Sequence, residues 1–173
     1  MSAVTPQDRV QVNHALQAAA LCYADLVRHA LGPNLVSVVL FGSVARGEAG
    51  PNSDIDLLLI AEEFPPGRFE RLRVLEGVDA EFEAELDRLR SLDIHTRLGR
   101  LLKTRAEAVR IVPLYLDLVE DARFLYDREG FFQSVLARLR NSLNQLGAER
   151  RTRGRVRYWV LKADWKPGEV IEL

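Results

Sequence analysis

The fold of this chain is decided by two stretches, Leu40-Phe41-Gly42-Ser43 and Ser53-Asp54-Ile55-Asp56-Leu57. The first ends an apolar, β-branched run that starts at Leu35, and the second opens a similar run that ends at Ala61. Runs of this length and composition predict two strands that are buried on both faces. Because side chains alternate along a strand, Asp54 and Asp56 are expected to project from the same side.

Two neighbouring carboxylates at the start of a buried strand repel each other unless a cation lies between them. Mg²⁺ is commonly held by one or two carboxylates together with the phosphates of a substrate. The pair Asp54 and Asp56 therefore indicates metal-dependent chemistry on a nucleoside triphosphate. The alternative, a surface turn followed by two solvated aspartates, is disfavoured because unpaired charge beside a buried strand is costly.

The composition limits the class of protein. The chain has 173 residues, of which 47% are hydrophobic and 28% are charged, and this profile is typical of one globular domain. The net charge of -1 provides no overall field toward nucleic acid or a membrane. The single cysteine, Cys22, excludes an internal disulfide, and we find no signal peptide and no membrane-spanning run, so a cytoplasmic protein is expected.

Helical signals surround the two strands. Thr5-Pro6 opens an apolar periodicity that predicts a helix as far as Ala30. The segment 42–53 is a glycine-rich loop with one helical turn at 43–46, and 62–67 is a linker. The spacing of apolar residues predicts one amphipathic helix over 68–90. The alternation that follows predicts a third strand over 91–98.

The second half of the chain continues in the same manner. Thr104-Arg105-Ala106-Glu107 is a capping box, Pro113 interrupts the helix that follows, and 116–120 is expected to be helical. Segment 123–126 is read as an edge strand, 131–146 as an amphipathic helix, and 156–160 and 170–171 as strands of a tail. The expected fold is α/β (α+β), with a mixed sheet flanked by helices, a C-terminal helix and a small β tail. We place a domain with its N-terminal helix at 1–128 and the helix with its tail, packed on the same domain, at 129–173.

These residues resemble the nucleotidyltransferase superfamily that includes DNA polymerase β. That family has an apolar residue, then Gly and Gly or Ser, a spacer of about a dozen residues, and an acidic-apolar-acidic triplet. Here the spacer after Ser43 has ten residues. The fuller motif is similar to the minimal nucleotidyltransferases, and the ending from Tyr158 to Glu169 resembles a group of uncharacterised nucleotidyltransferase-domain proteins. The resemblance implies the nucleotidyltransferase fold.

The resemblance assigns roles in nucleotide binding to Gly42, Ser43 and Arg46. Gly42 lets the backbone approach the triphosphate, and Ser43 can donate its hydroxyl to a phosphate oxygen or cap the short helix. Arg46 can bind phosphate or form a salt bridge with Glu48 or Asp54.

The resemblance also implies that Asp54 and Asp56 hold two Mg²⁺ ions about 3.5–4 Å apart. The family has a third carboxylate on a later, adjacent strand, and Asp93 is the candidate for this catalytic and metal-binding position. Asp117 is the second candidate, and the remaining case is that the chain has no third carboxylate. That case leaves metal and nucleotide binding but impairs catalysis.

Several other residues keep two interpretations. His95 either lines the pocket or is a structural histidine. A cluster of arginines either binds RNA, a polyphosphate or an acidic partner, or forms a solvated loop and strand edge; it consists of Arg150, Arg151, Arg153, Arg155 and Arg157. Trp159 and Trp165 either stack on a base or pack the tail on the sheet.

The implied reaction is the transfer of a nucleoside monophosphate to an acceptor hydroxyl with release of pyrophosphate, with ATP as the expected nucleotide. The acceptor classes are a protein side chain, a small molecule such as an aminoglycoside, and an RNA end. Minimal nucleotidyltransferases often resemble antitoxins that adenylylate a helical HEPN-type toxin. The alternative is a catalytically weak or inactive module that binds a nucleotide or a partner. The region after Tyr126 shapes either the acceptor site or a homodimer interface, and the length argues against a template-directed polymerase.

Overall fold

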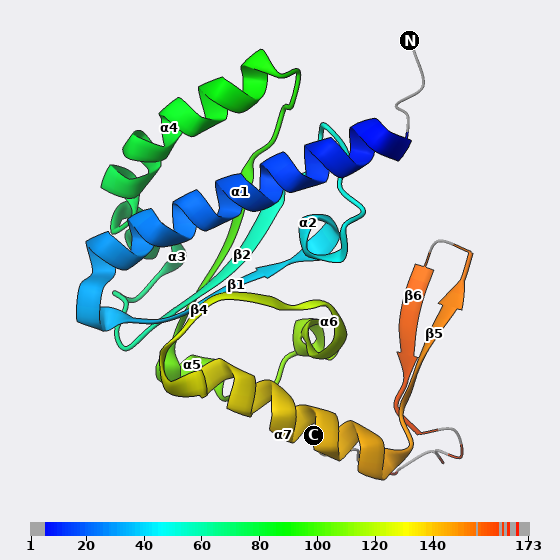
Figure 1. Ribbon diagram of the computed structural model, residues 1–173. Helices are drawn as coiled ribbons and strands as arrows, with labels where there is room; N and C mark the ends of the chain where they lie inside the picture. The colour runs from blue at the N-terminus through cyan, green and yellow to red at the C-terminus, as the bar shows by residue number, and fades with distance from the viewer. Residues whose placement is uncertain (1–5, 155, 163, 165, 167–168, 170–173) are drawn as a thin grey trace.

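A four-stranded mixed sheet lies at the centre of the computed structural model, which describes residues 6–154, 156–162, 164, 166 and 169 (Figure 1). Its strands are β1 (Leu35–Phe41), β2 (Ile55–Ala61), β3 (Leu98–Thr104) and β4 (Arg123–Asp127). The strand order is β3-β2-β1-β4, and β1 is antiparallel to both β2 and β4, whereas β2 and β3 are parallel. The expected α+β fold with a mixed sheet is confirmed.

Helices cover both faces of this sheet (Figure 1). One face carries α1 (Pro6–Leu31) and α4 (Glu76–Ser91), and the other carries α5 (Arg105–Ala108), α6 (Pro113–Asp121) and α7 (Phe131–Leu146). The remaining elements are α2 (Gly42–Arg46), α3 (Arg68–Arg73), the 3₁₀ turns η1 (Gly32–Asn34) and η2 (Arg128–Gly130), and a hairpin of β5 (Glu149–Arg153) and β6 (Val156–Val160). Within the described residues, no helix is both long enough and apolar enough to cross a membrane.

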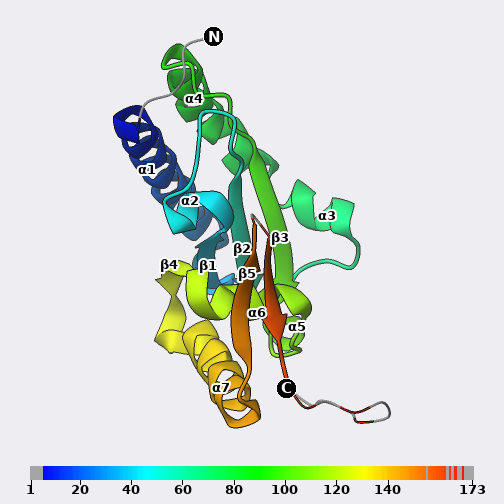
Figure 2. The same cartoon turned by 90° about the vertical axis from the view of Figure 1, so that its right-hand side faces the viewer.

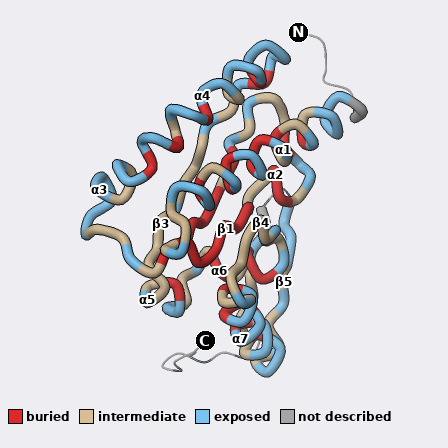
Figure 3. The backbone as a smooth tube through the Cα atoms, turned by 60° about the vertical axis from the view of Figure 1, so that its left-hand side comes forward, coloured by how far each residue is buried: buried red, intermediate tan, exposed pale blue. Residues whose placement is uncertain are grey.

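Alternate side chains of the central strands form two cores. Leu57 and Leu59 pack beneath α1 and α4, whereas Leu58 and Ile60 pack beneath α6 and α7. The central strands are therefore buried throughout, and Figure 3 shows them in red beneath the mostly exposed outer helix faces. This two-sided burial explains why the sequence of β2 is a continuous apolar run rather than an alternating one.

Most predicted elements are confirmed in place. The N-terminal helix, the strand over 35–41, the helical turn after it, the edge strand from Arg123 and the helix over 131–146 all form. The predicted second strand begins at Ile55, one residue after Asp54. Pro113 starts α6, as expected for a helix that restarts there. The predicted strand over 170–171 and the cap at Thr5 lie outside the described residues.

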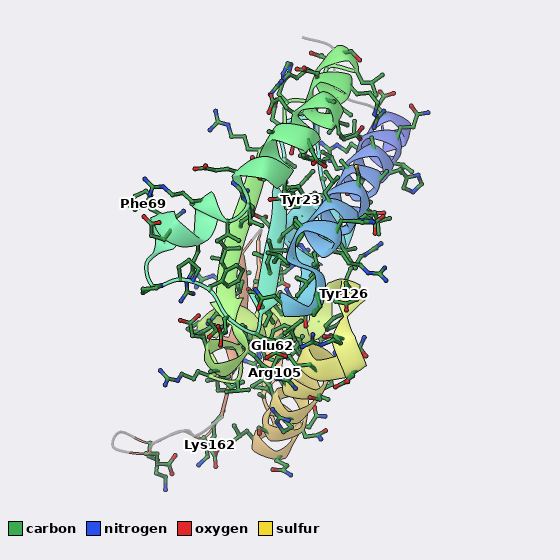
Figure 4. The ribbon with its side chains drawn as sticks, turned by 90° about the vertical axis from the view of Figure 1, so that its left-hand side faces the viewer. Tyr23, Glu62, Phe69, Arg105, Tyr126 and Lys162 are labelled. Atoms are coloured by element: carbon green, nitrogen blue, oxygen red, sulfur yellow. The ribbon has the colours of Figure 1, made fainter. Side chains whose placement is uncertain are left out.

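The prediction of one helix over 68–90 is wrong, because the segment divides into α3 and α4 around Val74 and Leu75. Leu75 is fully buried, whereas Phe69 is 80% exposed and projects from α3 into solvent (Figure 4). The two helices meet different neighbours, since α3 lies beside β3 and α4 packs on α1. The apolar periodicity continues across the break, and tertiary packing decides the direction of each half.

The prediction of a strand over 91–98 is also wrong. Helix α4 continues to Ser91, and the next residues close it with a Schellman motif. The amide of Ile94 donates to the carbonyl of Leu89, and the amide of Asp93 donates to the carbonyl of Arg90, each at 3.0 Å. Asp93 takes a φ of 59°, a left-handed conformation that Asp tolerates better than most residues. The apparent alternation therefore belongs to a helix end, and β3 begins only at Leu98.

A polar contact fixes β3 against the two helices above it. The hydroxyl of Tyr23 on α1 donates to Asp79 on α4 at 2.8 Å, and Arg100 on β3 donates to that hydroxyl at 2.8 Å. Burial raises the pKa of the Tyr23 phenol, so it stays protonated as a donor. Figure 4 shows Tyr23 between α1 and α4. Arg100 is next in the chain to Gly99, which the register of β2 and β3 places opposite Asp56.

The predicted capping box is confirmed at the start of α5. The Glu107 amide donates to the Thr104 hydroxyl at 3.2 Å, and the Glu107 carboxylate accepts from the Thr104 amide at 2.9 Å. The same carboxylate accepts two bonds from Arg71 on α3, at 2.7 and 2.8 Å. The Arg71 guanidinium, with the Thr104 amide, lowers the pKa of Glu107 to about 2.

We expect Glu107→Gln to lower the free energy of unfolding by about 1 kcal/mol at pH 7, because the pair with Arg71 is bidentate but partly exposed. A carboxyl whose pKa is lowered by folding contributes its stability above its unfolded pKa of about 4.3, and that contribution is lost as pH falls toward 2. Urea titrations at pH 7, 4 and 3 should therefore show that the difference in free energy of unfolding between the unaltered protein and Glu107→Gln narrows as the pH falls. Glu81→Gln is the control, since Glu81 is exposed and has no ion pair among the described residues; an equal effect in the two variants would contradict the assignment.

Candidate active site

Gly42 forms the sharp connection between β1 and α2. Its φ of 72° lies in the left-handed region, where a side chain would be strained. A Cβ at this position would also overlap with Oδ2 of Asp56. The chain therefore needs glycine here for two independent reasons, and the backbone of the turn lies directly against the carboxylate.

A second glycine lies on the opposite side of the same carboxylate. The parallel register between β2 and β3 pairs Asp56 with Gly99. A Cβ on Gly99 would lie 2.5 Å from Oδ1 of Asp56, closer than real Cβ contacts. Both oxygens of Asp56 thus face a glycine, one from the turn and one from β3. A glycine within a strand often marks such a close approach, and this signal in the sequence could have identified Gly99.

The charges around Asp56 favour a cation. Burial raises the pKa of the Asp56 carboxyl, and the negative charge of Asp54 raises it further, while the Arg46 guanidinium acts in the opposite direction. Asp54 is exposed at the start of β2. These two oxygen donors fit Mg²⁺, which needs only one or two protein carboxylates. Among the described residues, no group of three or more His, Cys, Asp or Glu side chains is arranged to hold a metal.

The loop between the turn and Asp54 is held by α1. Gln17 donates from Nε2 to the carbonyl of Val44 at 3.1 Å, and Oδ1 of Asn13 accepts from the amide of Ala49 at 3.3 Å. Asn13 is buried, with 4% of its surface exposed. The Gly50 amide also donates to the Ser53 hydroxyl at 2.9 Å. Functional groups that are supported in this way keep their geometry before a ligand arrives.

Arg46 extends from α2 into ion pairs rather than free solvent. Its Nε donates to Glu48 at 2.8 Å, and its Nη1 lies 3.6 Å from Oδ2 of Asp121. The predicted salt bridge with Glu48 is confirmed, and one with Asp54 is not among its contacts. Ser43 does not cap α2, because the N-cap residue is Phe41 and has no side-chain capping bond. Of the two interpretations of Ser43, contact with a phosphate remains a prediction.

The candidates for a third carboxylate do not lie on β3. Asp93, expected on a strand beside β2, is in the turn that ends α4, and its side chain is 99% exposed. Asp117 is part of α6, where Arg150 approaches it at 3.5 Å. The seven residues of β3 include no carboxylate, and the one opposite Asp56 is Gly99. Asp93 therefore does not occupy the position beside Asp56 that the resemblance implies for a third carboxylate.

His95 lies in the segment between α4 and β3. It lines a polar hollow of about 480 Å³ together with Asp54 and Arg97. Its Nε2 is 3.1 Å from Oδ1 of Asp93, and 60% of its side chain is exposed. His95 therefore lies in this hollow with Asp93 as its partner in the turn, and a role for it in the nucleotide pocket remains a prediction.

The arginine cluster divides between two faces of the hairpin. Arg150 and Arg157 line a cleft beside Arg46, whereas Arg151 is exposed and pairs with Glu149 at 2.9 Å. Arg153 is exposed as well. Trp159 packs against the core beneath α6 and α7, which confirms the packing interpretation. Arg155 and Trp165 lie outside the described residues.

We expect Gly99→Ala to remove divalent-metal binding with little loss of stability, because the new Cβ meets the end of the Asp56 side chain and not the backbone. Titration with Mn²⁺, followed by electron paramagnetic resonance, measures the first effect, and thermal unfolding measures the second. Gly77→Ala is the control, since nothing lies within 4 Å of a Cβ there. Unchanged metal binding in Gly99→Ala would show that Asp56 is free to move and that the close approach has no role.

Comparison with known proteins agrees with this geometry. The family model described as "Nucleotidyltransferase domain" matches residues 25–127. A curated relative from Methanocaldococcus jannaschii, named "Putative protein adenylyltransferase MJ1305", is 30% identical over 115 residues, which cover 66% of this chain and 74% of that protein.

Two solved structures are also similar to this chain. One is described as "a putative nucleotidyltransferase from Sulfolobus solfataricus"; it is 21% identical, the match covers 68% of this chain and 88% of that chain, and the TM-score is 0.43. The other is described as a "toxin-antitoxin with AMP-PNP"; it is 19% identical, the match covers 74% of this chain and 92% of that chain, and the TM-score is 0.43.

The matched residues 25–127 contain the turn, both aspartates and all four strands of the central sheet. With a family match over more than half its length and a curated relative at 30% identity, the chain belongs to the nucleotidyltransferase-domain family and is a transferase of that family.

Proposed function

We propose that this protein transfers AMP from ATP to an acceptor hydroxyl and releases pyrophosphate, with Mg²⁺ bound at Asp54 and Asp56. One observation carries the proposal. The Asp56 carboxylate lies between the turn at Gly42 and the backbone of Gly99, with the charge of Asp54 beside it. This arrangement brings a cation on the carboxylates and a phosphate on the turn into contact with each other.

The proposed reaction is a displacement at phosphorus. The acceptor oxygen forms a bond to the α-phosphorus, the bond from that phosphorus to the α–β bridging oxygen breaks, and pyrophosphate leaves. The hydroxyl proton passes to a base or to solvent. When bound, the two Mg²⁺ ions expected from the family supply charge neutralisation to the triphosphate and acidify the hydroxyl.

The residues of the chain have distinct parts in this reaction. Asp54 and Asp56 hold the cations, and the open backbone at Gly42 admits a phosphate. Ser43 donates its hydroxyl to a phosphate oxygen, and the planar fork of Arg46 binds another. Because the turn is held by α1, these donors need little reorganisation when the nucleotide binds.

The acceptor class follows from the named relative. A protein adenylyltransferase transfers AMP to a protein side chain, so its 30% identity to this chain supports a protein hydroxyl as the acceptor. The resemblance of the motif to minimal nucleotidyltransferases adds a more specific proposal, in which the acceptor is a HEPN-type toxin and this chain is its antitoxin. The C-terminal region then shapes either that acceptor site or a homodimer interface.

A second candidate function is a nucleotide- and partner-binding module with weak catalysis. The observation that favours it is the absence of a carboxylate on β3 beside Asp56, where Gly99 stands instead. Such a site holds a metal and a nucleotide but has one group fewer to activate the acceptor.

Calorimetric titration of ATP with and without Mg²⁺ tests the proposed site. We expect Asp54→Asn/Asp56→Asn to weaken Mg²⁺-dependent binding by at least about 100-fold, because both metal ligands lose their charge. Asp93→Asn is the matched control, since it removes one exposed charge and asparagine also tolerates the left-handed conformation.

Three results are informative. Loss of binding in the double variant, with Asp93→Asn unchanged, supports the site. Absence of ATP binding in the unaltered protein contradicts it. Equal losses in Asp93→Asn and the double variant would return Asp93 to the metal site.

Gly42→Ala tests the approach of the turn to the phosphates. We expect it to abolish measurable ATP binding, since the left-handed φ and the overlap with Asp56 both force the turn to move. Gly50→Ala, in the same loop, has a free space for its Cβ and no left-handed φ, so binding should stay within about twofold. If Gly42→Ala binds as tightly as Gly50→Ala, the nucleotide does not use the turn.

A further inference from the structure

A cleft of about 570 Å³ opens between the Gly-Ser turn region and the C-terminal hairpin. Its walls come from α2, the end of α6, the start of β4, and both strands of the hairpin. Figure 2 shows the hairpin in front of α6, with α2 above it. The hairpin lies beyond the matched residues 25–127, so the family match assigns nothing to this wall.

Four arginines line the cleft, and they come from four different elements. They are Arg46, Arg123, Arg150 and Arg157. Arg123 has no ion pair among the described residues. Nε of Arg150 is buried and has no hydrogen-bond partner within the same set of residues. The exposed Arg123 therefore remains available to an anion that enters the cleft.

The alternation of side chains along the hairpin strands places Arg150 and Arg157 on the face that lines the cleft. Arg150 and Thr152 lie two residues apart on β5, and Thr152 pairs with Arg157 on β6, so all three share one face. That face lines the cleft, whereas Arg151 lies on the other, exposed face. The hairpin therefore separates its arginines into a pair at the cleft and a pair in solvent.

Two carboxylates form ion pairs with three of the arginines at the cleft. Glu48 pairs with both Arg46 and Arg157, and Asp121 accepts two bonds from Arg150, at 2.7 and 2.8 Å, with Arg46 at 3.6 Å. The Arg157 and Arg46 guanidiniums hold the pKa of Glu48 below its usual range, and Arg150 does the same for Asp121. Both carboxylates are thus ionised at neutral pH. Within the described residues, the ion-pair partners of these three guanidiniums are Glu48, Asp121 and Asp117, and Glu120 also lines the cleft.

Helix α2 connects the cleft to the metal carboxylates. It begins at Gly42, which lies against Asp56, and ends at Arg46, which lines the cleft. A triphosphate whose one end is near Asp56 therefore has Arg46 beside it and the hairpin arginines beyond. The volume of the cleft lies within the usual range for a ligand pocket.

We infer that the C-terminal hairpin is the second wall of the nucleotide site, and that Arg150 and Arg157 bind the polyphosphate chain of a nucleoside triphosphate together with Arg46. This inference rests on the proposed function for the identity of the ligand. In the unbound protein the carboxylates Glu48 and Asp121 occupy the guanidiniums, and they compete with the phosphate oxygens for the same donors when the ligand enters. The hairpin is thereby part of the substrate site.

Titration with inorganic tripolyphosphate in the absence of divalent cations tests the hairpin separately from the metal site. We expect the unaltered protein to bind it and Arg157→Gln to bind it about 10-fold or more weakly, because a charge-assisted contact is lost. Arg151→Gln, on the exposed face of the same hairpin, should bind as the unaltered protein does. Thermal unfolding of all variants verifies that the hairpin variants remain folded.

Glu48→Gln distinguishes phosphate binding by Arg157 from a purely structural role of the ion pair between Arg157 and Glu48. If Arg157 binds phosphate, removal of its competing carboxylate leaves binding equal or tighter. If the ion pair only fastens the hairpin, Glu48→Gln weakens binding as Arg157→Gln does, and the inference is overturned. It is also overturned if tripolyphosphate does not bind, or if Arg157→Gln and Arg151→Gln behave alike.

The Asp54→Asn/Asp56→Asn variant keeps the two proposals distinct. It should lose Mg²⁺-dependent ATP binding and still bind tripolyphosphate without Mg²⁺ through the arginines. If ATP binding does not depend on these aspartates while tripolyphosphate binding depends on Arg157, the proposed function fails and the anion cleft stands. If ATP binding depends on the two aspartates while tripolyphosphate binding does not depend on Arg157, the metal site stands and the hairpin is not part of the nucleotide site.

Discussion

The Asp56 carboxylate has no free side toward its own sheet, since a glycine backbone faces each of its oxygens. Much of the structure around it follows from this constraint. The chain can cross from β1 to α2 only through a left-handed glycine, and β3 can pair alongside β2 only with a residue that has no Cβ opposite Asp56. The carboxylate is consequently held between the turn and β3. Its burial and the neighbouring charge of Asp54 make the binding of a cation favourable there.

The central part of the fold could be predicted from the sequence because its signals are local and agree with one another. Two apolar runs of strand length, a Gly-Ser turn and an Asp-x-Asp pair determine β1, α2 and β2 within one residue. The capping box at Thr104 and the helix that ends before Gly147 could also be predicted, since each depends on residues within one or two turns of a helix. Where propensity, pattern and turn chemistry point to the same answer, the structure follows them.

The predictions failed where short patterns have two physical solutions. The segment Leu92-Asp93-Ile94 alternates like a strand, but the same spacing suits a Schellman motif in which Ile94 returns to the core beside Leu89. The choice depends on where α4 stops, and packing against α1 determines that point. The arginine-rich segment before Gly154 was equally ambiguous, because its inward face is defined only by pairing with β6. The expectation that Asp93 lies on a strand beside β2 failed for the same reason, since the strand order that brings Gly99 beside Asp56 is a long-range property.

The anchoring of the Gly-Ser loop by α1 has a consequence for how the chain can be divided. Helix α1 has 26 residues and is about 39 Å long, and it reaches the loop through Asn13 and Gln17 near its beginning. The family match starts at residue 25, so both anchoring side chains lie upstream of it. A fragment cut at that boundary would retain every motif residue and every strand of the sheet, yet the amide of Ala49 would lose its buried acceptor. For this protein, the smallest fragment with the full motif is therefore shorter than the smallest fragment with a supported site.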